Sequence, residues 1–202
     1  MVVIMSQKIY IYPTDTVWGI GGDAFKEETY LKISQIKQTD ITKPLSVLFD
    51  STEMLGDYVE LPPKLLEIIE DLKHLEITFG VEKKYFHKSL PEIPFQSTDF
   101  ICVRVLGSEI IKNIIQEVNS PITTTSLNIT GESPIVTEEA AKDFWRKFAP
   151  NELLVSSSVG EEVTGNSSTI IILSGNEYKI LRSGNRVKEI EEILEDRFSR
   201  HG

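Results

Sequence analysis

The sequence predicts a single α/β domain over residues 1–202, built on a twisted mixed β-sheet that is flanked by helices. Short runs rich in β-branched and aromatic residues alternate along the chain with segments whose apolar residues recur at helical spacing. Prolines and glycines are spread through the chain instead of gathering in a linker. A chain of 202 residues with 40% hydrophobic content can bury one sizeable core.

The predicted strands are short apolar runs that end near turn-forming residues. The first ends at Pro13, because proline cannot donate a hydrogen bond to a neighbouring strand. Strands are predicted at residues 8–12, 45–49, 75–81, 100–105, 122–125, 153–156, 169–173 and 178–181.

The predicted helices show apolar residues at intervals of three and four. Pro62 and Pro63 stand where a helix can begin, and Ser108 and Thr137 are suitable N-caps for two others. Helices are predicted at residues 27–37, after Pro62, after Ser108, after Thr137 and in the charged tail at 187–198. The apolar residues of these helices are interpreted as core faces.

Composition excludes several classes of function. Thirty-one acidic residues against 21 basic ones give a net charge of −10, which argues against broad affinity for nucleic acid. No run is long and apolar enough to span a bilayer, and the N-terminus lacks the features of a secretory signal. We therefore expect a soluble, cytoplasmic protein that does not bind membranes.

The metal-binding residue types are few. The single cysteine, Cys102, excludes an internal disulfide and lies in an alternating apolar run, so we expect it to pack in the core. The histidines, His74, His87 and His201, show no ligand spacing. We expect no metal site formed by the protein itself.

Two polar motifs follow predicted elements near the N-terminus. Pro13-Thr14-Asp15-Thr16 is followed by three glycines, which allow either close approach of a ligand or a capped, glycine-rich turn. Lys37 and Lys43 flank a polar loop after the first helix. They could hold phosphates, although Lys37 also suits an ordinary helix C-terminus.

Two further motifs lie in the second half of the chain. The hydroxyl run at residues 123–126 leads to Asn128 and a polar loop, and it is typical of either a ligand site or a threonine-rich edge strand. Arg182 ends a predicted strand beside Gly184, where a guanidinium can reach an anion. Arg104 interrupts an apolar strand, and a cation in that position usually has a specific partner.

Taken in order, these motifs resemble the threonylcarbamoyl-AMP synthase family, the YrdC and Sua5 group of tRNA-modification enzymes. The resemblance covers most of the chain and rests on five segments. They are Pro13 to Gly19, Val103-Arg104, Ser126 to Gly131, Ser168-Thr169-Ile170 and Arg182-Ser183-Gly184. It implies a YrdC-like domain around a large open cavity.

The resemblance also implies an activity. L-threonine, bicarbonate and ATP would form threonylcarbamoyl-AMP and pyrophosphate, with Mg²⁺ held mainly by the ATP phosphates. The labile product would pass to a downstream tRNA threonylcarbamoyl transferase, with at most a weak contact to tRNA. Since charge accumulates on phosphoryl oxygens, positioning and cationic side chains should supply the catalysis without a protein nucleophile.

The same resemblance assigns roles to residues. Lys37, Lys43 and Arg104 are the candidate catalytic residues. The nucleotide would contact Lys37, Lys43, Ser126, Asn128, Ser133 and Arg182. L-threonine would contact Thr14, Thr16, Arg104 and Thr124, with Asp15, Ser168 and Thr169 in supporting positions.

The sequence departs from the family pattern in places. The Lys-x-Arg motif reads Lys37-Gln38-Thr39, which removes a bidentate phosphate contact. A histidine found in some members is Leu48, and a Trp-Pro-Gly-Pro-x-Thr stretch is reduced to residues 77–79. Two hypotheses follow: a synthase in which Lys43 or Arg186 replaces the arginine, or a divergent nucleotide- or RNA-binding protein without synthase activity.

Overall fold

One mixed β-sheet runs through the computed structural model, which describes residues 7–156, 163–175 and 177–199. Its strand order is β7-β1-β2-β6-β3-β5-β4-β8-β9. The strands are β1 (Tyr10–Pro13), β2 (Trp18–Gly21), β3 (Ser46–Phe49), β4 (Ile77–Glu82), β5 (Phe100–Val105), β6 (Ile122–Ser126), β7 (Leu153–Leu154), β8 (Thr169–Ser174) and β9 (Glu177–Arg182). The predicted fold class, a mixed sheet with flanking helices, is confirmed.

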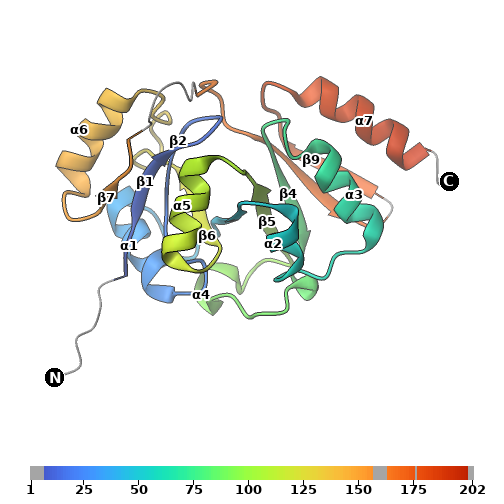
Figure 1. Cartoon of the computed structure of the whole chain (residues 1–202), viewed down its shortest axis with the longest axis horizontal. Coiled ribbons are helices and arrows are strands. Elements are labelled where there is room, and N and C mark those ends of the chain that lie inside the picture. The colour runs from blue at the N-terminus through green and yellow to red at the C-terminus, as the bar shows by residue number, and fades with distance from the viewer. Residues whose placement is uncertain (1–6, 157–162, 176, 200–202) are drawn as a thin grey trace.

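Helices flank this sheet from end to end. They are α1 (Glu27–Lys37), α2 (Thr52–Gly56), α3 (Pro63–Leu72), α4 (Glu92–Phe95), α5 (Glu109–Val118), α6 (Glu138–Phe148) and α7 (Val187–Ser199), with a 3₁₀ turn at Lys83–Tyr85. Figure 1 shows α6 and α7 at opposite ends of the molecule and α5 across its middle. The predicted caps are present: Ser108 accepts from the Ile111 amide, and Thr137 accepts from the Ala140 amide.

The sheet contains both parallel and antiparallel pairs, and several of them join segments that are far apart in sequence. Strand β6 lies between β2 and β3 and is antiparallel to both. Strand β8 is parallel to β4, and β3 is parallel to β5. The alternative that the hydroxyl run forms an edge strand is therefore wrong, since β6 occupies the middle of the sheet.

Two apolar clusters cover the sheet. The smaller one gathers the isoleucines of α5 with Tyr10, Tyr12, Leu48 and Ile122. The larger one contains the buried faces of α1, α3, α6 and α7 together with residues from most strands. Both clusters hold the strands firmly, so that strand ends can carry polar side chains in fixed positions.

Strand β2 and the short helices α2 and α4 were not predicted. The segment Trp18–Gly21 contains two glycines and was interpreted as part of a turn. A Cβ atom on Gly21 would lie 1.8 Å from the Thr123 carbonyl oxygen, so this glycine lets β2 approach the backbone of β6. The glycine serves strand packing here, which the sequence pattern could not distinguish from approach of a ligand.

Candidate functional site

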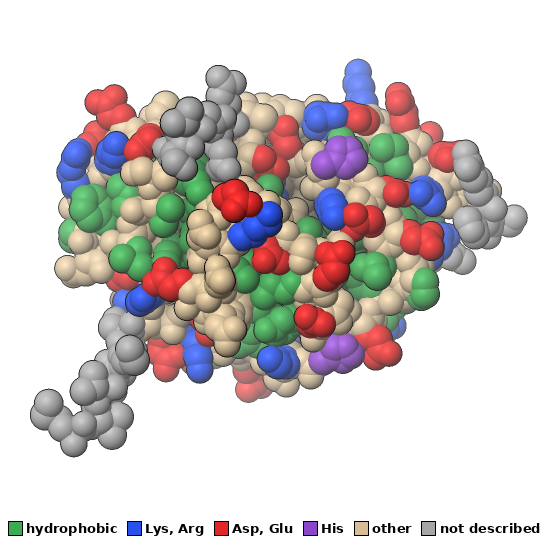
Figure 2. Space-filling view, in the orientation of Figure 1, with side chains coloured by type: hydrophobic (Ala, Val, Ile, Leu, Met, Phe, Trp, Pro, Cys, Tyr) green, Lys and Arg blue, Asp and Glu red, His purple; other side chains and the backbone are tan. Residues whose placement is uncertain are grey.

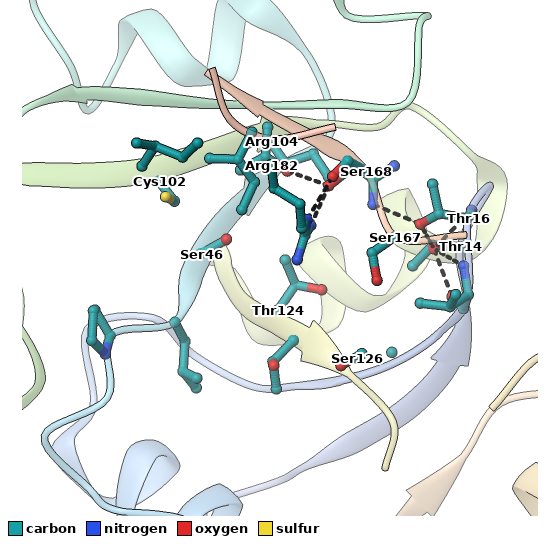
Figure 3. Close-up of a pocket in the computed structure, with 18 of the residues that line it drawn as sticks. Thr14, Thr16, Ser46, Cys102, Arg104, Thr124, Ser126, Ser167, Ser168 and Arg182 are labelled. Carbon is teal, nitrogen blue, oxygen red and sulfur yellow. Dashed lines mark hydrogen bonds between the residues drawn. The ribbon is translucent and has the colours of Figure 1, made fainter. Parts of the chain in front are cut away.

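The described residues enclose a cavity of about 420 Å³ at the middle of the sheet. Its walls come from the turn between β1 and β2, the loop before β3, and strands β4, β5, β6, β8 and β9. Figure 3 shows Thr124 and Ser126 on the strand that crosses the cavity, with Thr14 and Thr16 to one side. Arg104 and Arg182 lie close together above that strand.

The turn after β1 is a network of hydroxyl groups. The Thr14 hydroxyl donates to the Val17 carbonyl at 2.7 Å and accepts from the amides of Thr16 and Val17. The two threonine hydroxyls lie 3.0 Å apart, and because Thr14 donates elsewhere, Thr16 is the donor between them. The turn is thus rigid, and Thr16 keeps its lone pairs for other donors.

Arg104 lines the cavity and is held by two neighbouring side chains. Its Nη1 donates to the Thr16 hydroxyl at 3.1 Å, and its Nη2 forms an ion pair with Asp15. Only 7% of Arg104 is exposed. This explains a cation inside strand β5: the charge is paired, and the remaining N–H groups are available to an anionic ligand.

A second arginine faces the same space from the end of β9. Arg182 donates through Nε to the Ser168 carbonyl at 2.9 Å and through Nη2 to the Ser168 hydroxyl at 3.1 Å. Ser168 in turn shares a hydrogen bond with Thr78. Partial burial of the guanidinium lowers the pKa of Arg182, and repulsion by Arg104 adds to this effect.

The cavity carries an excess of positive charge. Among the described residues, no carboxylate lies within ion-pair distance of Arg182 or of Lys43, which also lines the cavity. Asp15 neutralises only Arg104. Two cations that lack a carboxylate partner in one cavity favour a ligand with several negative charges.

Lys37 holds the end of β6 and the residues that follow it through hydrogen bonds. Its ammonium donates to the Ser126 carbonyl, to the Asn128 carbonyl at 2.9 Å and to Asn128 Oδ1 at 2.9 Å. The residue is only 4% exposed and does not line the cavity. Burial, with the positive charge of Lys43, lowers the pKa of Lys37 to about 8.

The structure brings most of the predicted site residues together but not all of them. The cavity is lined by Thr14, Thr16, Lys43, Arg104, Thr124, Ser126, Ser168 and Arg182. Lys37, Asn128, Asp15, Ser133 and Thr169 do not line it. Ser133 is exposed on a loop, and the buried Thr169 hydroxyl accepts from the Gly184 amide.

Cys102 was wrongly expected to be a core residue. It is partly exposed and lines the cavity, two positions from Arg104 on the same face of β5. Burial raises the pKa of its thiol, so it is not activated as a nucleophile. Strand alternation from Arg104 would have placed Cys102 and Phe100 in the cavity, and the same reasoning from Ser168 would have found Ile170.

Strand alternation from a predicted site residue could not have identified two other lining residues. Thr78 and Ser46 reach the cavity through strand pairing between distant segments. Thr39, the position of the missing arginine, is half-buried and does not line the cavity. Its amide donates to the Ser34 carbonyl, which ends α1.

No group of three His, Cys, Asp or Glu side chains in the described part of the chain could hold a metal ion. No helix described here has the length and apolar character that crossing a membrane requires.

Known proteins resemble this chain along most of its length. Residues 2–184 match the model of the protein family of Sua5, YciO and YrdC, which carries the description "Telomere recombination". A threonylcarbamoyl-AMP synthase of Pseudoalteromonas atlantica is 28% identical over 182 residues, covering 88% of this chain and 91% of the relative.

Solved structures resemble the fold. A double variant of Pyrococcus abyssi Sua5 is 27% identical with a TM-score of 0.74, covering 92% of this chain and 56% of that one. A structure of Pyrococcus abyssi Sua5 complexed with L-threonine has the same fold, with a TM-score of 0.74 and 24% identity over 91% of this chain and 53% of that one. This chain therefore spans about half of the Pyrococcus protein.

Proposed function

Because the chain belongs to the family of Sua5, YciO and YrdC proteins, we propose that it is an L-threonylcarbamoyladenylate synthase. The observation that carries the proposal is the cavity, where Lys43 and Arg182 have no carboxylate partner among the described residues and where Thr16 and Asp15 hold Arg104. The name of the Pseudoalteromonas relative supports the same activity.

The reaction uses L-threonine, bicarbonate and ATP. The threonine amine and bicarbonate combine to a carbamate with loss of water. A carbamate oxygen then attacks the α-phosphorus of ATP, and the new P–O bond forms as the bond to the pyrophosphate oxygen breaks. Negative charge rises on the phosphoryl oxygens, which positioned cations stabilise more strongly than water does.

The geometry supports a division of the cavity between the substrates. We assign the threonine carboxylate to Arg104, which Asp15 and Thr16 hold in place, with Thr14 and Thr124 beside the amino acid. We assign the phosphates to Lys43 and Arg182, and the rest of the nucleotide to the end of β6 at Ser126. Lys37 does not line the cavity, so Lys43 takes the phosphate contacts on this side.

Magnesium enters this proposal with ATP. Because no cluster of three carboxylate, histidine or cysteine side chains fits a metal in the described residues, we assign Mg²⁺ no protein ligands and derive no step from it. Phosphate oxygens and water are its expected ligands.

The product defines the next reaction. A mixed anhydride of a carbamate and a phosphate hydrolyses readily, so an acyl transferase that modifies adenosine in tRNA should consume it. We place both steps in the cytoplasm, where ATP and tRNA are available. Any direct contact of this chain with tRNA should be weak, given its net charge of −10.

The test is pyrophosphate release from ATP by folded protein with Mg²⁺. Release should require both L-threonine and bicarbonate, and mass spectrometry should detect threonylcarbamoyl-AMP. Arg182→Gln should lower kcat/KM for ATP roughly 10- to 100-fold, the worth of a charged hydrogen bond. Arg146→Gln, an exposed arginine on α6, is the matched control.

Two outcomes would contradict the proposal. Release that is absent, or that ignores threonine, excludes the synthase. ATP binding without turnover would indicate a nucleotide-binding protein that lacks the activity. Thr39→Arg separates a lost phosphate contact from a repurposed loop, because only the former predicts tighter ATP binding.

A further inference from the structure

The side chain of Asn128 has its complete set of hydrogen-bond partners. Nδ2 donates to the carbonyls of Ile129 and Glu132, both at 2.9 Å. Oδ1 accepts from the Lys37 ammonium at 2.9 Å and from the Ser126 hydroxyl at 2.7 Å. An amide offers two donors and two acceptor lone pairs, so none remains for a ligand.

The orientation of this amide is determined by its surroundings. If its oxygen and nitrogen were exchanged, the nitrogen would face the Lys37 ammonium, and the oxygen would face two carbonyl oxygens. The exchanged amide would thus place a donor against a donor and an acceptor against two acceptors, in a site where Asn128 is only 9% exposed. Oδ1 therefore faces Ser126.

This orientation decides the role of the Ser126 hydroxyl. Oδ1 can only accept a hydrogen bond, so the Ser126 hydroxyl must donate its one proton to Asn128. Ser126 lines the cavity, and what it offers there is the lone pairs of its oxygen. An ionised phosphate oxygen is also an acceptor and gains nothing from such a group.

We propose that Lys37 and Asn128 are positioning residues that fix Ser126 as a hydrogen-bond acceptor in the cavity, where it receives an O–H or N–H donor of the ligand. This inference rests on the proposed function for the identity of the ligands, which offer such donors in the ribose and in the amino acid. It separates Ser126 from the phosphate contacts, which fall to Lys43 and Arg182.

Calorimetric titration of Ser126→Ala tests the proposal without turnover. The probes are ATP, 2′-deoxy-ATP, 3′-deoxy-ATP, L-threonine and magnesium pyrophosphate. Ser34→Ala is the matched control, because the Ser34 hydroxyl lies on α1 and donates to the Leu31 carbonyl. Loss of one neutral hydrogen bond should weaken the affected ligand about three- to tenfold.

The pattern of losses identifies the source of the donor. If a ribose hydroxyl is the donor, ATP loses affinity in Ser126→Ala, and the deoxynucleotide that lacks this hydroxyl does not. If the amino acid is the donor, only L-threonine is weakened. Pyrophosphate should bind native and variant protein alike.

Equal weakening of pyrophosphate and ATP would overturn the proposal, because Ser126 would then donate to a phosphate. Unchanged affinity for every probe would overturn it as well. Pyrophosphate release by the native protein is measured in parallel. A failure of the synthase assignment appears in that assay, whereas a failure of the acceptor assignment appears in the titrations.

The positioning role has its own readout. Lys37→Met keeps most of the unbranched side chain but removes the ammonium that donates to three acceptors. Hydrogen exchange should accelerate at the amides of residues 127–132, with the amides of α5 unchanged. Exchange that is unchanged at residues 127–132 would contradict the role of Lys37.

Discussion

At the scale of single residues, two cations that line the cavity differ from a cation that only holds other residues. Arg182 and Lys43 have no carboxylate partner among the described residues and face the cavity. Lys37 is a cation of the other kind, since it lies beneath the site with its ammonium on three oxygens. Sequence alone could not distinguish them, because each lysine lies near the same polar loop.

Arg104 allows a prediction about which substrate a substitution affects. Its two contacts, to Asp15 and Thr16, use the separate ends of a planar guanidinium, which lysine cannot reproduce. Arg104→Lys should therefore reduce kcat/KM for L-threonine roughly 10- to 100-fold, with ATP affinity changed less than about twofold. Steady-state kinetics and titration measure the two effects.

An equal loss for threonine and ATP would show that Arg104 does not belong to the amino-acid part of the cavity. Arg146→Lys on the exposed face of α6 controls for the substitution itself.

The lowered pKa of Lys37 predicts a pH dependence. Above a pH of about 8 the ammonium loses a proton, and one of its three acceptors loses its donor. Ligand affinity at the end of β6 should therefore fall as pH rises through 8. Lys43, on the loop after α1, is the charged group that adds to the effect of burial. In Lys37→Met, which has no such group to titrate, the affinity should be low and should not change through this pH range.

Loss of this proton from Lys37 does not itself destabilise the fold. Between pH 8 and the ordinary lysine pKa of 10.5, the unfolded chain binds this proton and the native protein does not. The contribution of Lys37 to the free energy of unfolding therefore rises with pH in this window. A native affinity that stays level up to pH 9.5 would contradict the assignment.

At the scale of elements, the Arg182-x-Gly184 motif combines the proposed ligand contact with a packing requirement. Gly184 lies where the chain leaves β9 and passes the start of β8. A Cβ atom there would lie 2.7 Å from the Thr169 nitrogen and 2.8 Å from the Ser167 oxygen. The backbone must therefore pass β8 closely for Arg182 to reach Ser168.

Gly184→Ala should lower the free energy of unfolding by about 1–3 kcal/mol, the usual cost of forcing backbone apart. Urea denaturation measures the change, with Gly56→Ala as the control. Nothing lies within 4 Å of a Cβ atom at Gly56, and alanine favours the helix that ends there. If both variants are equally stable, the close packing at Gly184 does not constrain the fold.

Most helices and strands could be predicted because their apolar periodicity and capping residues lie within the element itself. Helix α1 begins and ends at the predicted residues, as does strand β5. Strand β2 was missed because two of its four residues are glycines and its pairing with β1 and β6 defines it. Pairing between distant segments also determines the sheet order, which no local pattern contains.

The site was less predictable than the fold for a related reason. Motifs identified which segments carry polar residues, and eight of the predicted residues line the cavity. The direction of each side chain was not evident, as Lys37 and Asn128 show. Their hydrogen bonds to one another depend on how the loop after β6 closes over α1.

At the scale of the whole molecule, the charge distribution separates the cavity from the surface. The chain carries a net charge of −10, yet the cavity gathers Lys43, Arg104 and Arg182. On the face seen in Figure 2, acidic and basic side chains are interspersed without a basic stripe. Such a protein can attract a small polyanion into the cavity while its surface as a whole repels a long one.

Binding to RNA should therefore be weak. For an RNA of unrelated sequence at about 0.15 M salt, we expect a Kd weaker than roughly 10⁻⁴ M, the upper end for nonspecific binding. Filter binding or fluorescence anisotropy measures this, with a basic RNA-binding protein as the positive control. Micromolar binding would contradict this expectation.

The strand order has a consequence for how the protein is made. Strand β6 joins β2, and β8 joins β4, only after long intervening stretches have been synthesised. Such pairings close large loops and form slowly compared with local contacts. Because Ser126 and Arg182 lie at the ends of late strands, the cavity cannot be complete until residue 182 has left the ribosome. Activity should appear only after that point, when the two halves of the sheet can close.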